Sequence, residues 1–412
     1  MEEYHVNADA LREQAILRAA TAVIQVGKND DGTIWTEGIY DPEAALKEKR
    51  ETGGDTQIYW KQIDFNLRWN RISGTNTLDS VGQVIDYFAS EYAQYKTRIE
   101  QQYTGDEQAE ALAKLEELFS ERVAESADEF SRLVGDFLEA NGVEGEHDAI
   151  RNSFLDIYEQ RKTTYLGFIE DHPDYAGVKG TEDEWLLTAG NFMGEQLRYA
   201  MISQQPEMSE ASEYGYSMDD LYVAGTLVKE LARFQSPTWS YNRSEEELGV
   251  ELGVGAMKYA LLSNCFDLSD DVKSKLDQAF NNLMNNAIDN ANKYIDQQRS
   301  DPFVRNKEAY TMKIDKTAVM DIIKQMVENL NAKDVNAAFR SNLTTYMSIY
   351  KQKMQVGQTS SLARYHSYYS SWMNQNFASE WNPFVDRISA GTAVDMSRYL
   401  LKEQMQWLDI TV

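Results

Sequence analysis

Few side chains in this sequence have the chemistry of a nucleophile or a proton carrier. The 412 residues include one cysteine, Cys265, and four histidines. A cysteine nucleophile depends on a nearby base, most often a histidine, and a lone cysteine is more often a small buried side chain. The Gly-x-Ser-x-Gly signature is absent, although a Ser-His-Asp arrangement stays open. We therefore predict no catalytic residue from these side chains.

The spacings of a metal site are missing as well. The histidines stand at positions 5, 147, 172 and 366, too far apart in sequence to nominate ligands, and no His-Glu-x-x-His occurs. Residues 28–32 have the composition of a calcium loop. The register that puts Gly32 at the sharp turn, however, places Gly27 and Gly38 where carboxylates are required. We expect a plain turn there and no bound metal.

One glycine-rich run invites comparison with a phosphate-binding loop. Residues 248–255 contain Gly249, Gly253 and Gly255, but no Lys-Ser/Thr pair follows them. No dinucleotide-binding glycine pattern occurs either, so we expect no cofactor. The spacing of Gly249 and Gly253 instead suits close contact between two helices.

Four acidic clusters resemble active-site carboxylates until helix capping is considered. They lie at residues 181–184, 217–220, 244–247 and 269–271, and each begins with Thr or Ser. A hydroxyl at the cap and acidic residues after it satisfy the free amides of a helix N-terminus. Capping therefore accounts for all four clusters. A pair of catalytic carboxylates cannot be singled out among 67 acidic residues.

The most suggestive recognition surface is residues 364–374, with Trp381 following. Tyr, Trp, Ser and Asn are concentrated there, as they are in surfaces where rigid aromatic rings supply contact area and small polar groups adapt. The alternative is that Tyr365, Tyr369 and Trp372 share one helical face and pack inside. The candidate binding residues are His366, Tyr368, Trp372, Asn374 and Trp381.

A long helical hairpin is the element around which the fold is predicted to form. Apolar residues recur every three or four positions through residues 81–103 and again through 112–138, the spacing of one helical face. Between them, Gly105 ends one helix and Asp106 begins the next. A third helix over residues 147–170 completes a first bundle.

The remaining pattern predicts an all-α protein of two multi-helix bundles. A small irregular or β-hairpin element is expected near residues 27–65, with 56–65 open to strand or helix. The predicted domains are 1–75, an N-terminal helix with the irregular segment; 76–205, the first bundle; and 206–412, the second bundle. Further helices are predicted at 7–26, 42–50, 185–203, 272–298, 316–330, 335–355, 360–377 and 392–408.

The charge of the chain restricts its partners. The net charge is -27, from 40 basic and 67 acidic residues, which disfavours nucleic acid and anionic lipid. No apolar run approaches the ~18 residues of a membrane span. No secretory signal stands at the start. We expect a cytoplasmic location by default, with export that uses no cleaved signal as an open alternative.

These features favour a non-catalytic binding or assembly protein over an enzyme. A protein partner and homo-oligomerisation through the long helices both fit this expectation. The alternative is a helical hydrolase or lyase that uses carboxylates in a cleft between the two bundles. Convergent carboxylates of perturbed pKa would favour the enzyme, and flat aromatic patches would favour binding.

Overall fold

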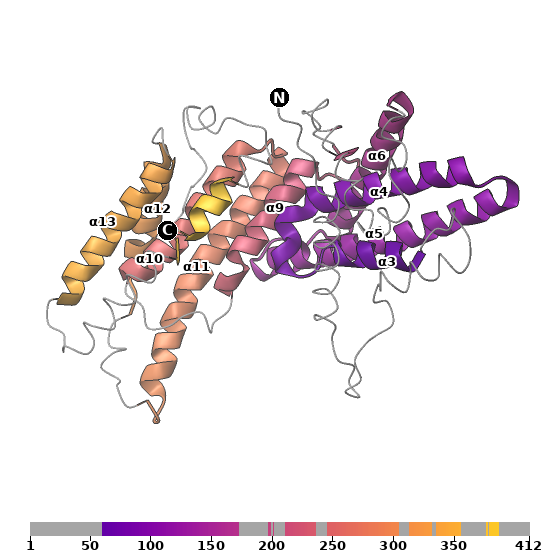
Figure 1. Cartoon of the computed structure of the whole chain (residues 1–412). Coiled ribbons are helices and arrows are strands. Elements are labelled where there is room, and N and C mark those ends of the chain that lie inside the picture. Colours follow the sequence, from indigo (N-terminus) through magenta and orange to yellow (C-terminus); the bar gives the residue numbers. More distant parts are fainter. Residues whose placement is uncertain are drawn as a thin grey trace, which may run out of the picture. The chain divides into compact units, whose positions relative to one another are not determined.

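The protein is all-α in the part of the chain that its computed structural model describes (Figure 1). That part comprises residues 60–172, 197–198, 201, 211–235, 245–304, 313–331, 335–355, 376–377 and 379–386. No strand occurs among these residues. The helices predicted at 7–26, 42–50 and 392–408, most of those at 185–203 and 360–377, and residues 27–59 of the predicted hairpin lie outside them.

The described helices follow the predicted periodicity closely. The helix predicted at 335–355 has those bounds, and the ambiguous segment 56–65 is helical from Trp60 onward. The α-helices are α3 (Trp60–Trp69), α4 (Val81–Gln102), α5 (Gly105–Ala140), α6 (His147–Asp171), α9 (Met218–Leu231), α10 (Glu245–Cys265), α11 (Asp270–Ser300), α12 (Lys316–Glu328) and α13 (Val335–Gln355). Short 3-10 helices are η1 (Thr75–Ser80), η3 (Ala232–Gln235) and η6 (Asn329–Asn331).

Backbone contacts divide the molecule into two compact units. The first unit comprises described residues within 60–74, 80–130 and 151–215, and the second those within 75–79, 131–150 and 216–386. The division falls inside α5 and α6, because each of these helices contributes residues to both units. The predicted domain limits at 75/76 and 205/206 remain predictions.

Aromatic side chains join α4 to α5 in the first unit. The rings of Tyr92 and Phe119 meet edge to face, with centroids 5.4 Å apart, and both side chains are buried. Gly105 begins α5 with φ +62°, a left-handed conformation that glycine adopts readily. Gln108 then donates hydrogen bonds to the carbonyl oxygens of Glu100 and Tyr103, which satisfies the end of α4.

Helix α10 is the centre of the second unit and is buried on nearly every side. The predicted close contact at Gly249 and Gly253 is confirmed. A Cβ atom built at Gly249 would lie 2.9 Å from Cβ of Ile322, and one at Gly253 would lie 2.4 Å from Sδ of Met326, both in α12. Only glycine lets the two helices approach so closely.

Two of the predicted helix caps lie within the described residues, and they differ. Ser217 forms a complete capping box with Asp220: each side chain accepts a hydrogen bond from the other residue's backbone N–H. Ser269 stands at the N-cap of α11, but its side chain makes no capping hydrogen bond. Its backbone N–H instead donates to Oδ1 of Asp220 at 3.1 Å. The prediction of a hydroxyl cap is therefore wrong at Ser269, because Asp220 fixes this residue through its backbone.

None of the described helices combines the length and apolar character needed to cross a lipid bilayer.

Candidate functional site

Trp381 is the one predicted binding residue that the structure describes. Its side chain is fully buried. The indole Nε1–H donates to Oδ1 of Asn336 at 2.9 Å, and the ring stacks on Phe339 with centroids 4.4 Å apart. Trp381 therefore fills the core between two helical segments. The other predicted binding residues, His366, Tyr368, Trp372 and Asn374, lie outside the described residues, and their role stays a prediction.

An aromatic pair with one exposed member, Trp69, lies on α3 in the first unit. Ile63 and Leu67 form the buried face of this helix. On its outer side Phe65 stacks on Trp69, with ring centroids 6.2 Å apart, and Trp69 is 57% exposed. A tryptophan this exposed is uncommon, because burying it would remove a large apolar area from water.

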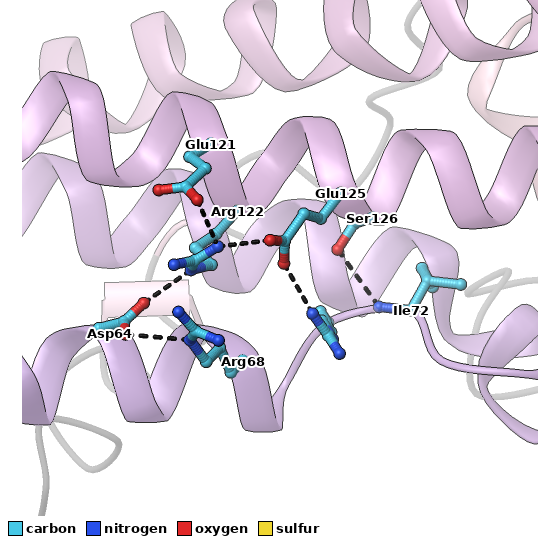
Figure 2. Close-up of polar contacts among 8 residues, drawn as sticks. Asp64, Arg68, Ile72, Glu121, Arg122, Glu125 and Ser126 are labelled. Atoms are coloured by element: carbon cyan, nitrogen blue, oxygen red, sulfur yellow. Dashed lines mark hydrogen bonds and ion pairs between the residues drawn. The ribbon is translucent and has the colours of Figure 1, made fainter. Parts of the chain in front are cut away.

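A group of charged side chains holds α3 against α5 (Figure 2). Arg122 of α5, whose side chain is only 5% exposed, lies between the carboxylates of Asp64, Glu121 and Glu125. Its Nε lies 2.6 Å from Oδ1 of Asp64. Arg68 binds the other oxygen of Asp64 at 3.0 Å. We call these five residues the α3 clamp.

The electrostatics of the α3 clamp follow from its geometry. Partial burial acts to raise the pKa of Asp64, but hydrogen bonds and attraction from Arg122 and Arg68 outweigh it, so this pKa is lowered. Burial likewise acts to lower the pKa of Arg122, and its carboxylate partners reverse the effect and raise it. Both groups are thus held in their charged forms, as a stable ion pair requires.

The chain that follows α3 is fixed to α5 as well. Arg71 pairs with Glu125 at 2.6 Å, and the backbone N–H of Ile72 donates to Oγ of Ser126 at 3.3 Å (Figure 2). Gly74 donates in the same way to a carboxylate oxygen of Glu129. The helix that carries Phe65 and Trp69 is therefore held along its length and at its C-terminal end.

Cys265 and the two carboxylates of raised pKa, Asp86 and Asp219, are engaged in packing. Cys265 is buried, as predicted, and burial raises the pKa of its thiol to about 12, so it is protonated at neutral pH. Burial raises the pKa of Asp86, against the attraction of Arg161 and a hydrogen bond from the hydroxyl of Tyr165. Burial also raises that of Asp219, although this side chain accepts a hydrogen bond from the backbone N–H of Asp267.

The sequence interpretation missed two groupings. The α3 clamp joins Asp64 to Arg122, 58 positions apart, and only the local spacing of Asp64 with Arg68 and of Arg122 with Glu125 was visible in the sequence. The second grouping brings His147 beside Asp136 and Glu139 across the turn between α5 and α6. Its signal was a pair of carboxylates on one helical face, eleven and eight residues before a histidine.

Comparison with known proteins adds no relative: no family model, no curated protein and no solved structure matches this chain.

Proposed function

We propose that this protein works by binding another protein and has no catalytic activity. The observation that carries the proposal is the exposed Trp69, which stacks on the half-buried Phe65 on a helix that the α3 clamp holds in place. Tryptophan, tyrosine and arginine are enriched among the few residues that carry most of the binding energy in protein–protein contacts. Fully burying a large apolar side chain such as phenylalanine contributes about 1.5–3 kcal/mol.

The rigidity of the support strengthens this interpretation. A contact residue on a mobile segment loses conformational entropy when a partner orders it, about 0.5–1.5 kcal/mol for each side chain. Arg122 is nearly buried and joins three carboxylates, and Arg71 ties down the following chain. The backbone that carries Trp69 is therefore already ordered when the chain folds.

The charge around the aromatic pair suggests the chemistry of the partner. Lys61 and Arg68 are exposed on α3, whereas the chain as a whole carries a net charge of -27. A partner surface with acidic groups around an apolar centre would match this face. The exposed side of α5, with Glu110 and Glu117, has the acidic part of that character, so a second copy of the chain is one candidate.

The wider architecture remains part of the proposal. We propose that two bundles form around the antiparallel hairpin 81–138, with a small irregular or β-hairpin element near residues 27–65, of which 60–65 belong to α3. The predicted surface of His366, Tyr368, Trp372 and Asn374 would supply a second contact region of the same composition.

The alternative is a hydrolase or lyase with carboxylates in a cleft between the bundles. It would need several carboxylates of perturbed pKa facing one space. Among the described residues, the two carboxylates of raised pKa, Asp86 and Asp219, belong to different units and have partners within their own units. This arrangement gives the binding function the better support.

A site-specific photo-cross-linker tests the proposal in the cells that produce the protein. Benzoylphenylalanine placed at Trp69 is expected to give a discrete cross-linked product on irradiation. The matched control places it at Asp321, which is also exposed but lies on α12 in the second unit. The mass of the product distinguishes a second copy of the chain from a different protein.

The purified partner then allows a quantitative check. Trp69→Ala is expected to weaken binding at least tenfold, with an unchanged circular dichroism spectrum, because the removed side chain is exposed. Equal cross-linking from positions 69 and 321, or an unchanged affinity in the variant, would contradict the proposal.

A further inference from the structure

The turn between α5 and α6 gathers three side chains that can bind a metal ion. Asp136 and Glu139 lie near the end of α5, and His147 begins α6, all within the second unit. One ligand atom from each residue lies within 4.8 Å of the other two. Nε2 of His147 is 3.4 Å from Oε1 of Glu139. Metal–ligand bonds of about 2.0–2.2 Å bring ligand atoms closer together than 4.8 Å, so the side chains would rotate toward the ion on binding.

Two buried glycines make room for the imidazole. A Cβ atom at Gly135 would lie 2.3 Å from Cε1 and 2.4 Å from Nδ1 of His147. A Cβ atom at Gly145 would lie 2.8 Å from Nε2 of the same ring and 2.7 Å from Oε1 of Glu139. Any larger residue at either position would displace the ring or the carboxylate. The two glycines thus allow the imidazole to lie against α5, beside the carboxylates.

The turn that delivers His147 is fixed by α11 and by Tyr216. Both carboxylate oxygens of Glu146 are occupied, one by the hydroxyl of Tyr216 and one by Nζ of Lys275, each at 2.5 Å. Nδ2 of Asn282 donates to the carbonyl oxygen of Asn141 at 2.7 Å. The residue before the histidine and the first residue of the turn therefore have fixed positions. A metal ion would meet ligands that are already assembled.

The ligand set selects the class of metal. An imidazole nitrogen with two carboxylates suits Zn²⁺ and neighbouring transition metals, whereas Mg²⁺ and Ca²⁺ favour oxygen ligands alone. Two carboxylates and a neutral imidazole also neutralise a dication. Arg132 pairs with Asp136 at 3.2 Å, but both side chains are more than half exposed, so this pair is weak and leaves the other carboxylate oxygen to a metal.

We propose that Asp136, Glu139 and His147 bind a divalent transition-metal ion such as Zn²⁺, with water completing the coordination. The spacing of the histidines in the sequence gave no sign of this site, because its ligands converge only when the chain reverses at the turn. The proposal concerns the second unit and does not depend on the binding function of α3.

Calorimetric titration of the full chain with Zn²⁺ tests the site. Excess Mg²⁺ in the buffer would occupy the weak carboxylate sites that a protein of net charge -27 offers elsewhere. One Zn²⁺ per chain is expected to bind under these conditions. Asp136→Asn and His147→Gln are each expected to weaken binding at least tenfold. The matched control is Asp321→Asn, which removes an exposed carboxylate from α12 in the same unit.

Nuclear magnetic resonance of the histidine rings gives a direct readout on the unaltered protein. Of the four histidines, one ring is expected to shift on addition of Zn²⁺, and Asp136→Asn should move this shift to a Zn²⁺ concentration at least tenfold higher. Because Asp136 is exposed, this variant is expected to keep the fold even if His147→Gln does not. Zn²⁺ affinity equal in Asp136→Asn and Asp321→Asn, or no histidine shift at saturating Zn²⁺, would overturn the proposal.

Discussion

Gly249→Ala is the substitution whose effect the structure fixes most closely. The added methyl would lie 2.9 Å from Cβ and from Cγ2 of Ile322, whereas ordinary contacts begin at 3.4 Å. Cβ of Ile322 is attached directly to the α12 backbone and cannot rotate away. The α10 and α12 backbones must therefore separate locally by about half an ångström, which in a close-packed interior costs about 1–3 kcal/mol.

Two opposing effects determine the net result of Gly249→Ala. Replacing glycine by alanine in a helix stabilises it by about 1 kcal/mol, so strain and propensity together give a net loss of about 1 kcal/mol. Gly167→Ala is the matched control, because Gly167 lies in α6, is exposed, and has no atom within 4 Å of an added Cβ. This control has the propensity gain without the strain, so its stability should rise.

Urea unfolding followed by far-UV circular dichroism measures both variants. Gly249→Ala should unfold at lower urea concentration than the natural protein, and Gly167→Ala at higher. If the two units unfold in separate transitions, each substitution should move only the transition of its own unit. A gain in stability for Gly249→Ala as large as that for Gly167→Ala would refute the reasoning, since it would mean that α12 moves away from α10 at no cost in free energy.

Three further predictions concern the α3 clamp, the caps and the cysteine. Folding lowers the pKa of Asp64. The ion pairs of its carboxylate therefore stabilise the folded protein fully above about pH 4, and this stabilisation is lost as the pH falls through the pKa of Asp64 in the folded state. Arg122→Met should therefore lower stability at neutral pH but much less in acid; an equal loss at both, in thermal unfolding, would contradict this. Ser217→Ala removes a capping box and should cost about 1 kcal/mol, whereas Ser269→Ala should change stability little, and urea unfolding that reversed this order would be inconsistent with the observed caps. Cys265 should react with a thiol reagent only on unfolding, because it is buried and its pKa is raised to about 12; rapid labelling of the folded chain would disprove this.

Much of the helical structure could be predicted because its determinants are local. The apolar residues that define α4 and α5 recur at three or four positions, and Gly105 and Asp106 mark the boundary between the two helices. The contact at Gly249 and Gly253 was visible for the same reason, since small residues four apart lie on one helix face.

The α3 clamp could not be predicted, because it joins residues that are distant in sequence, and the metal-ion site could not, because its residues meet only where the chain reverses. No local pattern links Asp64 to Arg122 or places the ring of His147 against Gly135. Trp381 shows the opposite difficulty. The composition of residues 364–374, which Trp381 follows, suited either a surface or a core. Only the contacts of Trp381 with Phe339 and Asn336 identify this side chain as buried. Residue type reports chemistry, whereas burial depends on the elements that pack nearby.

Helix α5 provides a test of whether the two proposed sites are coupled. It contributes Arg122 to the first unit and the ligands Asp136 and Glu139 to the second. Residues without shared partners usually have additive effects. Trp69→Ala should therefore leave Zn²⁺ affinity unchanged, and Asp136→Asn should leave cross-linking at position 69 unchanged. The affinity for the partner should also be measured with and without Zn²⁺. A difference beyond twofold would show that the metal ion acts on the binding face. By linkage, the partner would then change the Zn²⁺ affinity by the same factor.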